Sequence, residues 1–183
     1  MQTFLKKFIF VPFQVKFDSQ VLLNSKNIKT MTGLYQWLEF AEKSSDQPLK
    51  FVIKEHPSDP HKYTELYNKN PNIIFSNRDT KELIEKADAV ITVNSSVGLE
   101  AILLHKRVIV LGEACYGIEG FCHPVKTEQR LSEVINQLSS WQLDIDLVEN
   151  FLAYLTREYC VPTSWRNPDR KHIDSLRKKF KAI

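Results

Sequence analysis

The sequence predicts an α/β protein, built on an open parallel sheet with Rossmann-like winding and about five strands. Short apolar runs alternate along the chain with segments whose apolar residues recur every three or four positions. The apolar runs are continuous, as in parallel strands that are buried on both faces. No Asn-Gly or Asp-Gly pair is present to close a β-hairpin. Together these observations favour strands joined by crossover helices.

The first half of the chain supplies two of the expected strands and two helices. A helix over 31–43 is predicted from the spacing of Leu34, Trp37, Leu38 and Ala41. The other elements are read from apolar runs and from breaks at proline. In order they are a strand at 7–13, a loop at 14–30, a strand at 51–53 stopped by Pro57 and Pro60, and a helix at 61–69.

The second half continues the alternation of strands and helices. The expected strands lie at 72–75, 89–93 and 107–111. The expected helices lie at 80–86 with Asp79 as N-cap, at 96–105 with Ser95 or Ser96 as N-cap, at 128–140 and at 145–158. A long loop is expected at 112–127. Residues 1–165 are therefore predicted to form one Rossmann-like domain.

The positive charge of the chain is concentrated in its last residues, 166–183, which we predict to be a basic helical tail. This segment holds seven Lys and Arg against two Asp, whereas the rest holds 18 basic and 20 acidic residues. A nucleic-acid binder usually spreads its positive charge over a face of the fold, so no nucleic-acid partner is expected. Two interpretations of the tail are open: a solvated helix, or a patch that contacts anionic lipid or a partner.

The cysteines and the N-terminus predict a protein of the cytoplasm. Cys115, Cys122 and Cys160 are odd in number and have neither disulfide nor zinc-site spacing, so we expect reduced thiols and no metal. Residues 1–7 are too polar to lead a signal peptide, and no apolar run is long enough to span a membrane.

A first candidate cluster, Lys54-Glu55-His56-Pro57, directly follows the strand 51–53. Ligands of open α/β sheets bind at the carboxyl ends of the strands, and Pro57 ends the strand there. His56 can donate to a phosphate oxygen or act as a general acid toward a leaving phosphate, and Lys54 is expected on the same side of the strand. The alternative is a structural histidine at a strand end.

A second candidate cluster, Asn94-Ser95-Ser96-Val97-Gly98-Leu99-Glu100, follows the strand 89–93. Hydroxyls and free amides at a helix start attract anions, and Gly98 would let a ligand or another backbone approach closely. Glu100 lies one turn beyond Ser96 and could accept hydrogen bonds from sugar hydroxyls. The alternative is an ordinary capped helix. With no Gly-x-Gly-x-x-Gly and no P-loop lysine, dinucleotide and nucleoside triphosphate sites are disfavoured.

The loop that follows the strand 107–111 adds a third candidate, Tyr116. The segment 116–121 lies on the same edge as both clusters, where Gly117 and Gly120 would let it form a flexible rim over a sugar. The equally open alternative is a surface loop anchored by its tyrosine.

These residues together resemble the capsule polysaccharide biosynthesis family. The resemblance rests on Lys54-x-His56-Pro57, on the run from Asp88 to Ala101, and on Val108-x-Val110-Leu111-Gly112-Glu113-Ala114-x-Tyr116. The opening Val11-Pro12-x-Gln14-Val15-x-x-Asp18-Ser19-Gln20 is also similar. The likeness covers roughly residues 8–125. The family includes bacterial transferases of 3-deoxy-manno-octulosonic acid (Kdo), which use the CMP-activated sugar.

The resemblance implies the C-terminal, CMP-sugar-binding half of a GT-B glycosyltransferase for capsule or surface polysaccharide, working without metal or cofactor. It implies that His56 contacts the donor phosphate and takes part in catalysis, that Ser95 and Ser96 hold this phosphate, and that Glu100 engages the nucleotide sugar. Lys54, Asn94, Gly98 and Tyr116 complete the expected substrate-binding set. The glycan or glycolipid acceptor would bind a preceding domain, which this chain is expected to lack.

Two other functions remain open from the sequence. One is a non-catalytic nucleotide-binding fragment or subunit, and the other is a GT-B relative that uses a UDP-sugar, such as a transferase or an epimerase. A partner domain with a carboxylate facing the site separates the first from an enzyme. The preferred nucleotide, CMP or UDP, decides the second.

Overall fold

The computed structural model describes residues 7–161 and 166–181, and the chain divides into two compact units, of which the first ends at Asp144 and the second begins at Ile145. The sequence had placed the division after residue 165. Residues 1–6, on which the expectation of no leader peptide partly rests, lie outside the described residues.

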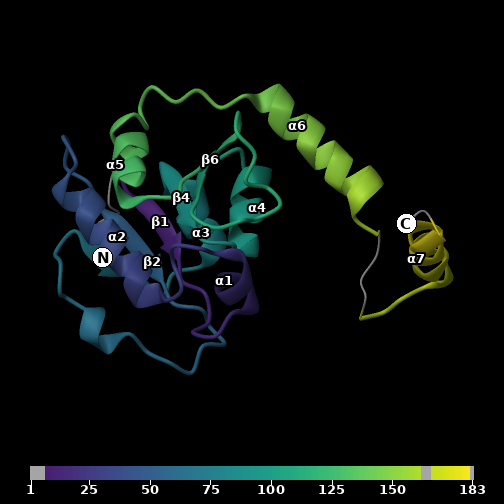
Figure 1. Ribbon diagram of the computed structural model, residues 1–183, viewed down its shortest axis with the longest axis horizontal. Coiled ribbons are helices and arrows are strands. Elements are labelled where there is room, and N and C mark those ends of the chain that lie inside the picture. The colour runs from purple at the N-terminus through teal and green to yellow at the C-terminus, as the bar shows by residue number, and fades with distance from the viewer. Residues whose placement is uncertain (1–6, 162–165, 182–183) are drawn as a thin grey trace. The chain divides into compact units, whose positions relative to one another are not determined.

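Unit 1 is built on a six-stranded sheet in the order β3-β2-β1-β4-β5-β6, with every neighbouring pair parallel (Figure 1). The strands are β1 (Ile9–Pro12), β2 (Phe51–Lys54), β3 (Ile73–Phe75), β4 (Ala89–Thr92), β5 (Arg107–Val110) and β6 (Cys122–Pro124). The chain winds outward from β1 to β3, returns to β4 beside β1, and winds outward again to β6. This doubly wound order confirms the predicted open sheet with Rossmann-like winding.

Helices of unit 1 cover both faces of this sheet. They are α1 (Ser19–Asn24), α2 (Met31–Lys43), α3 (Thr80–Lys86), α4 (Ser96–Leu103) and α5 (Glu128–Asn136). The predicted N-cap of α3 is confirmed, because the Asp79 carboxylate accepts a hydrogen bond from the backbone N–H of Glu82 at 3.1 Å.

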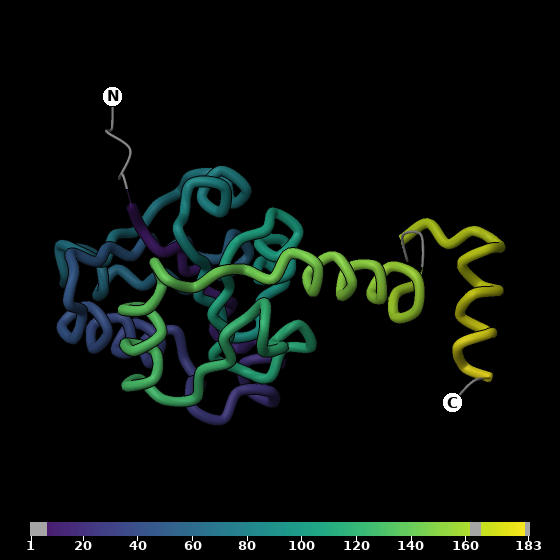
Figure 2. Tube along the Cα trace, turned by 90° about the horizontal axis from the view of Figure 1, so that it is seen from above, coloured from purple at the N-terminus to yellow at the C-terminus, as the bar shows by residue number. Residues whose placement is uncertain are grey.

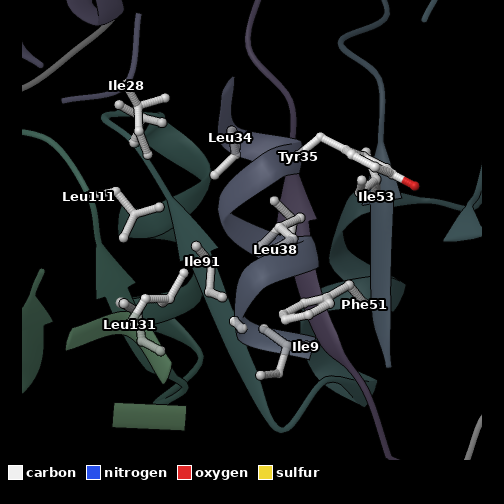
Figure 3. Close-up of a cluster of buried hydrophobic side chains, with 14 of the residues drawn as sticks. Ile9, Ile28, Leu34, Tyr35, Leu38, Phe51, Ile53, Ile91, Leu111 and Leu131 are labelled. Carbon is white, nitrogen blue, oxygen red and sulfur yellow. The ribbon is translucent and has the colours of Figure 1, made fainter. Parts of the chain in front are cut away.

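The larger core lies between the sheet and the helices α2 and α5. Leu34 and Leu38 of α2 point into the same apolar cluster as Ile9 of β1 and Ile91 of β4, and Leu131 of α5 closes the cluster (Figure 3). All five side chains are at most 1% exposed. The helix predicted over 31–43 is therefore present, and it buries the face that its spacing indicated.

The opposite face of the sheet is buried equally well. Phe10 and Val90 alternate with the residues of the first core and are fully buried, as are Leu83 of α3 and Ile102 of α4. Because both faces of the sheet are covered, the ends of the strands are where a ligand can approach this fold.

Two segments in the first half differ from the sequence-based expectation. The expected loop at 14–30 contains the short helix α1, which buries only Val21 and so gives no periodic signal. The expected helix at 61–69 is reduced to a 3₁₀ turn at Thr64–Leu66, because Tyr67 is already extended and Asn68 follows it with a positive φ of 57°.

The later elements differ mainly in their lengths. The expected loop at 112–127 includes β6, a strand of three residues that contains a proline and was too short to predict. The helix expected at 128–140 ends at Asn136. The helix expected at 145–158 becomes α6 (Ile145–Tyr154), followed by a single π-helical turn at Leu155–Tyr159.

Unit 2 consists of α6, the π-helical turn and α7 (Arg170–Lys181), the helix predicted in the basic tail. These helices form the green-to-yellow part of the trace in Figure 2. Nowhere in residues 7–161 or 166–181 is there a helix with both the length and the apolar character needed to cross a membrane.

The core packing predicts a large effect for Leu38→Ala. This substitution removes a fully buried side chain, so we expect the free energy of unfolding to fall by about 2–5 kcal/mol. Urea unfolding followed by fluorescence measures the change, since Trp37 and Trp141 pack against this core. The matched control is Leu23→Ala, whose side chain is 78% exposed and whose effect should stay within about 0.5 kcal/mol. Equal effects of the two would contradict this account of the core.

Candidate functional site

The sequence-predicted residues gather at the carboxyl edge of the sheet, around the point where its winding reverses. β1 and β4 are neighbours there, and β2 lies on the other side of β1. His56 follows β2, and Asn94, Ser95 and Ser96 connect β4 to α4. β2 and β4 are two strand spacings apart, roughly 10 Å. The structure therefore brings the two predicted clusters to one edge, with the end of β1 between them.

Ser95 and Ser96 have different roles in the turn from β4 to α4. Ser95 is the N-cap: its Oγ accepts a hydrogen bond from the Val97 N–H at 3.2 Å, and its own N–H donates to Oγ1 of Thr92 at 3.0 Å. Ser96 is the first helical residue and is exposed. Its hydroxyl has no hydrogen-bond partner among the described residues, so it is available to a ligand.

Asn94 binds the protein itself. Its Nδ2 donates to the carbonyl oxygens of Gln20 at 2.7 Å and of Asn24 at 2.9 Å, and so attaches α1 to the turn. Its Oδ1 lies against Gly112, where a Cβ atom would approach it to 2.0 Å. Both Asn94 and Gly112 therefore serve the structure of this edge, and the predicted contact of Asn94 with substrate has no direct support here.

Gln14 connects the loops after β1 and β4. In the sequence it is part of the motif that begins at Val11, with no sign of this structural role. Its side chain is 3% exposed. Its Oε1 accepts from the Asn94 N–H at 3.0 Å, and its Nε2 donates to the Asp18 carboxylate at 3.0 Å. A glutamine after a strand is not by itself a signal of burial, and its main partner is 80 residues away.

Asp59, which no sequence motif indicated, connects the loops after β1 and β2 in the same way. Its side chain is only 4% exposed. One carboxylate oxygen accepts from the Lys16 N–H and the other from the His61 N–H, each at 3.0 Å. Buried carboxylates need such partners, so Asp59 fixes the loop that carries His56.

His56 is exposed at the end of β2, as the sequence predicted. Its Nδ1 accepts a hydrogen bond from the Ser58 N–H at 3.2 Å. In a neutral imidazole this leaves the proton on Nε2, which can then donate to a ligand. The ring is thus oriented by its own loop and presents one donor.

Lys54, expected on the same side of the strand as His56, is the last residue of β2 and points to α3. Its Nζ donates to Oγ1 of Thr80 at 2.9 Å. Glu55, which lies between them, accepts from the Tyr63 N–H at 2.9 Å and pairs with Lys62 at 3.6 Å. Lys54 and Glu55, the two charged residues that precede His56, therefore both bind other groups of the protein.

The three remaining predicted residues belong to α4 and to the loop after β5. Glu100 is exposed one turn beyond Ser96. Gly98 is buried and lies against the ring of Tyr116. Tyr116 itself is only 4% exposed, and its hydroxyl donates to the carbonyl oxygen of Ser95. Burial raises the pKa of this phenol, so it stays protonated. Tyr116 is not an exposed rim residue in this structure.

A cavity of about 490 Å³ lies near the carboxyl ends of β2 and β3. Its wall includes Glu55, Tyr67, Phe75 and Asn77. Another cavity, of about 440 Å³, lies at the opposite edge of the sheet, where the strands begin. Within the described ranges, no group of three His, Cys, Asp or Glu side chains is arranged to hold a metal ion.

The sequence of this chain matches a known protein family. Residues 2–156 match the model of the family described as capsule polysaccharide biosynthesis protein. Protein FixF of Sinorhizobium fredii is 38% identical over 162 residues, which cover 88% of this chain and 40% of FixF. The capsule polysaccharide export protein KpsS of Escherichia coli is 23% identical over 82% of this chain and 40% of KpsS. The chain thus spans about two-fifths of the length of these relatives.

Solved structures resemble the fold. The β-Kdo 2,7 transferase structure of KpsC from Thermosulfurimonas dismutans has a TM-score of 0.54 and 27% identity, covering 68% of this chain and 40% of that one. The UDP-GlcNAc 2-epimerase of Methanocaldococcus jannaschii, solved with UDP-GlcNAc and UDP, has a TM-score of 0.55 and 11% identity, covering 83% and 46%. The second likeness concerns the fold alone.

Proposed function

This chain belongs to the family of capsule polysaccharide biosynthesis proteins, and we propose that it is the donor-binding part of a glycosyltransferase that uses a CMP-activated sugar. One observation supports the proposal most directly. The Ser95-capped start of α4 and the exposed His56 follow strands on either side of β1. Two side chains that reach inward across roughly 10 Å can hold one phosphate between them.

The start of α4 is suited to the phosphate of the donor. The backbone N–H groups of a first helical turn and the helix dipole both favour an anion. Ser96 adds a hydroxyl with no other partner among the described residues. The Ser95 hydroxyl caps the helix as an acceptor, so its O–H can still donate to a phosphate oxygen beside Ser96.

His56 assists the departure of the nucleotide. In the transfer, the bond between the anomeric carbon and the phosphate oxygen breaks, and CMP leaves with the electron pair. The Nε2–H of His56 donates to the phosphate as its negative charge grows. The acceptor hydroxyl forms the new bond to the anomeric carbon and gives its proton to a base. Glu100, one turn into α4, accepts hydrogen bonds from hydroxyls of the nucleotide sugar.

Kdo is the sugar that we propose for this donor. KpsC, which is named a Kdo transferase and is 27% identical to this chain, supports this choice. The sequence motifs support it as well. A UDP-sugar, as bound by the epimerase of similar fold, is the alternative, which a comparison of nucleotides can decide. We place the chain in the cytoplasm, where its three free cysteines stay reduced.

The acceptor, a glycan or glycolipid, requires a second binding surface that faces the donor site. At this edge Glu100 is exposed but is assigned to the donor, and Glu113, which is also exposed, pairs with Lys26 at 3.1 Å. This chain spans about two-fifths of the length of its curated relatives, which fits a site that another domain or chain completes. We propose that this other part orients the acceptor and supplies the base. A non-catalytic nucleotide-binding subunit is the alternative.

Unit 2 gives a second surface of interest, on the basic helix α7. Ile173, Leu176 and Phe180 form one stripe along it, and Phe180 is 74% exposed. Lys178, Lys179 and Lys181 lie in its last turn. A helix with an exposed apolar stripe and a basic face suits the surface of an anionic membrane. We therefore propose peripheral contact of α7 with the inner face of the membrane.

The donor site predicts a preference among nucleotides. In a thermal-shift assay with CMP, UMP, AMP and NAD, CMP should give the largest stabilisation, because ligand binding raises the unfolding temperature. Ser96→Ala and His56→Ala should each weaken CMP binding about ten-fold, the usual cost of a hydrogen bond to a charged group. Ser139→Ala, an exposed serine at the opposite edge of the sheet, is the matched control. Equal shifts for all four nucleotides, or a larger one for NAD, would refute the proposal.

The need for this second binding surface predicts that this chain alone does not transfer sugar efficiently. With CMP-Kdo it should give at most slow hydrolysis, because proximity of the acceptor and general-base catalysis each contribute several powers of ten. An acceptor-side domain, fused or added as a separate chain, should restore transfer, and His56→Ala should abolish it again. Product analysis by mass spectrometry distinguishes hydrolysis from transfer. Rapid transfer by the 183-residue chain would place the acceptor site on this unit instead.

The composition of α7 predicts salt-sensitive binding to lipid. Vesicles that contain phosphatidylglycerol should retain the protein at low salt and release it at high salt, while phosphatidylcholine vesicles should not bind it. Phe180→Glu should reduce the binding measured by co-sedimentation. Phe17→Glu, at a residue that is 77% exposed in unit 1, should leave it unchanged. Binding that ignores salt and lipid charge would leave α7 as a solvated helix.

A further inference from the structure

Tyr116 is brought from the loop after β5 onto the first turn of α4. Its hydroxyl donates a hydrogen bond to the carbonyl oxygen of Ser95, the N-cap residue. This contact joins two loops at the carboxyl edge of the sheet, 21 residues apart in the chain. Because the ring is only 4% exposed, the phenol cannot exchange this partner for water without leaving its pocket.

The place of the ring depends on Gly98. A Cβ atom at this position would lie 2.4 Å from the hydroxyl oxygen and 2.6 Å from Cζ of Tyr116. No side chain can approach a ring so closely, so any larger residue would displace the tyrosine. Gly98 has no positive φ that would require glycine, and glycine inside a helix costs about 1 kcal/mol relative to alanine. Accommodation of Tyr116 accounts for a glycine here.

The backbone N–H, the hydroxyl oxygen and the carbonyl oxygen of Ser95 all make hydrogen bonds as a result. Its N–H donates to Thr92, its Oγ accepts from Val97, and its carbonyl oxygen accepts from both the Gly98 N–H and the Tyr116 hydroxyl. What remains of its hydrogen-bonding capacity is the O–H proton, which has no acceptor among the described residues. Its neighbour Ser96, which follows it directly into the helix, takes its position and direction from how firmly Ser95 is held.

We propose that Tyr116 is a positioning residue for the anion site of α4, and that Gly98 is a glycine in order to admit the Tyr116 ring rather than a ligand. The ligand in this inference, the phosphate of CMP, rests on the proposed function. The sequence had suggested both residues as direct substrate contacts. The geometry assigns them instead to the support of Ser95, and through it to the orientation of Ser96.

The first test is Tyr116→Phe, which keeps the ring and removes only the hydroxyl. We expect affinity for CMP to fall about five-fold, the usual worth of one hydrogen bond, and affinity for cytidine, which has no phosphate, to stay the same. Tyr154→Phe, at a tyrosine that is 56% exposed, is the matched control. Equal losses for CMP and cytidine, or no loss for either, would overturn the positioning role.

The second test separates the two explanations of Gly98. If the glycine admits Tyr116, Gly98→Ala should weaken CMP binding strongly in the wild-type background and hardly at all once Tyr116→Ala has removed the ring. This non-additivity is what a double-mutant cycle measures. If Gly98 instead gives room to the ligand, Gly98→Ala should weaken CMP binding equally in both backgrounds, and the proposal would be wrong.

A third measurement needs no ligand, so it distinguishes a failure of this inference from a failure of the proposed function. The N–H groups of Val97 and Gly98 are both bonded to Ser95, and their hydrogen exchange reports how firmly that residue is held. Tyr116→Phe should speed their exchange several-fold, while Tyr154→Phe should not. Unchanged exchange would overturn the inference, whereas a wild-type chain that does not bind CMP would overturn only the proposed function.

Discussion

The hydrogen bonds from the Asn94 amide to the carbonyl oxygens of Gln20 and Asn24 hold together the part of the candidate site that surrounds the start of α4. Helix α1 has six residues and buries only Val21, so neither its own hydrogen bonds nor its packing would hold it in place. Asn94 attaches it to the β4–α4 turn, and the Glu113 N–H, which donates to Asn24 at 2.7 Å, attaches it to the loop after β5. Three loops of the carboxyl edge thereby become one structure.

The polar residues at the carboxyl edge of the sheet form two sets with different roles. One set is buried or half-buried and bonded within the protein: Gln14, Asp59, Asn94, Ser95 and Tyr116. The other set, His56, Ser96 and Glu100, is exposed. A ligand that arrives at the edge can bind the second set without breaking any hydrogen bond of the first. The division also explains why an amide or hydroxyl at the right place in a motif is not necessarily a ligand contact.

The sequence predicted those parts of the fold whose signal is local. The helix α2 is long enough to show its helical period, and the strands β1, β2, β4 and β5 are continuous apolar runs. The positions of these elements along the sequence could therefore be predicted. The helix α1 and the strand β6 are too short for a period. Gln14 and Asp59 were missed as supporting residues because their partners are 80 and 43 residues away. Ser95 and Ser96 could not be told apart either, since either could cap the helix.

A site supported in this way is organised before its ligand arrives. The turn that precedes α4 is already held by hydrogen bonds at the Ser95 Oγ, N–H and carbonyl, so binding at Ser96 need not order it. The His56 ring is likewise oriented by the Ser58 N–H. Affinity and electrostatic stabilisation both benefit when donors are fixed in advance, because less reorganisation opposes binding. The hydrogen bonds of Asn94, Asp59 and Tyr116 therefore contribute to function by preventing movement of the few groups left exposed.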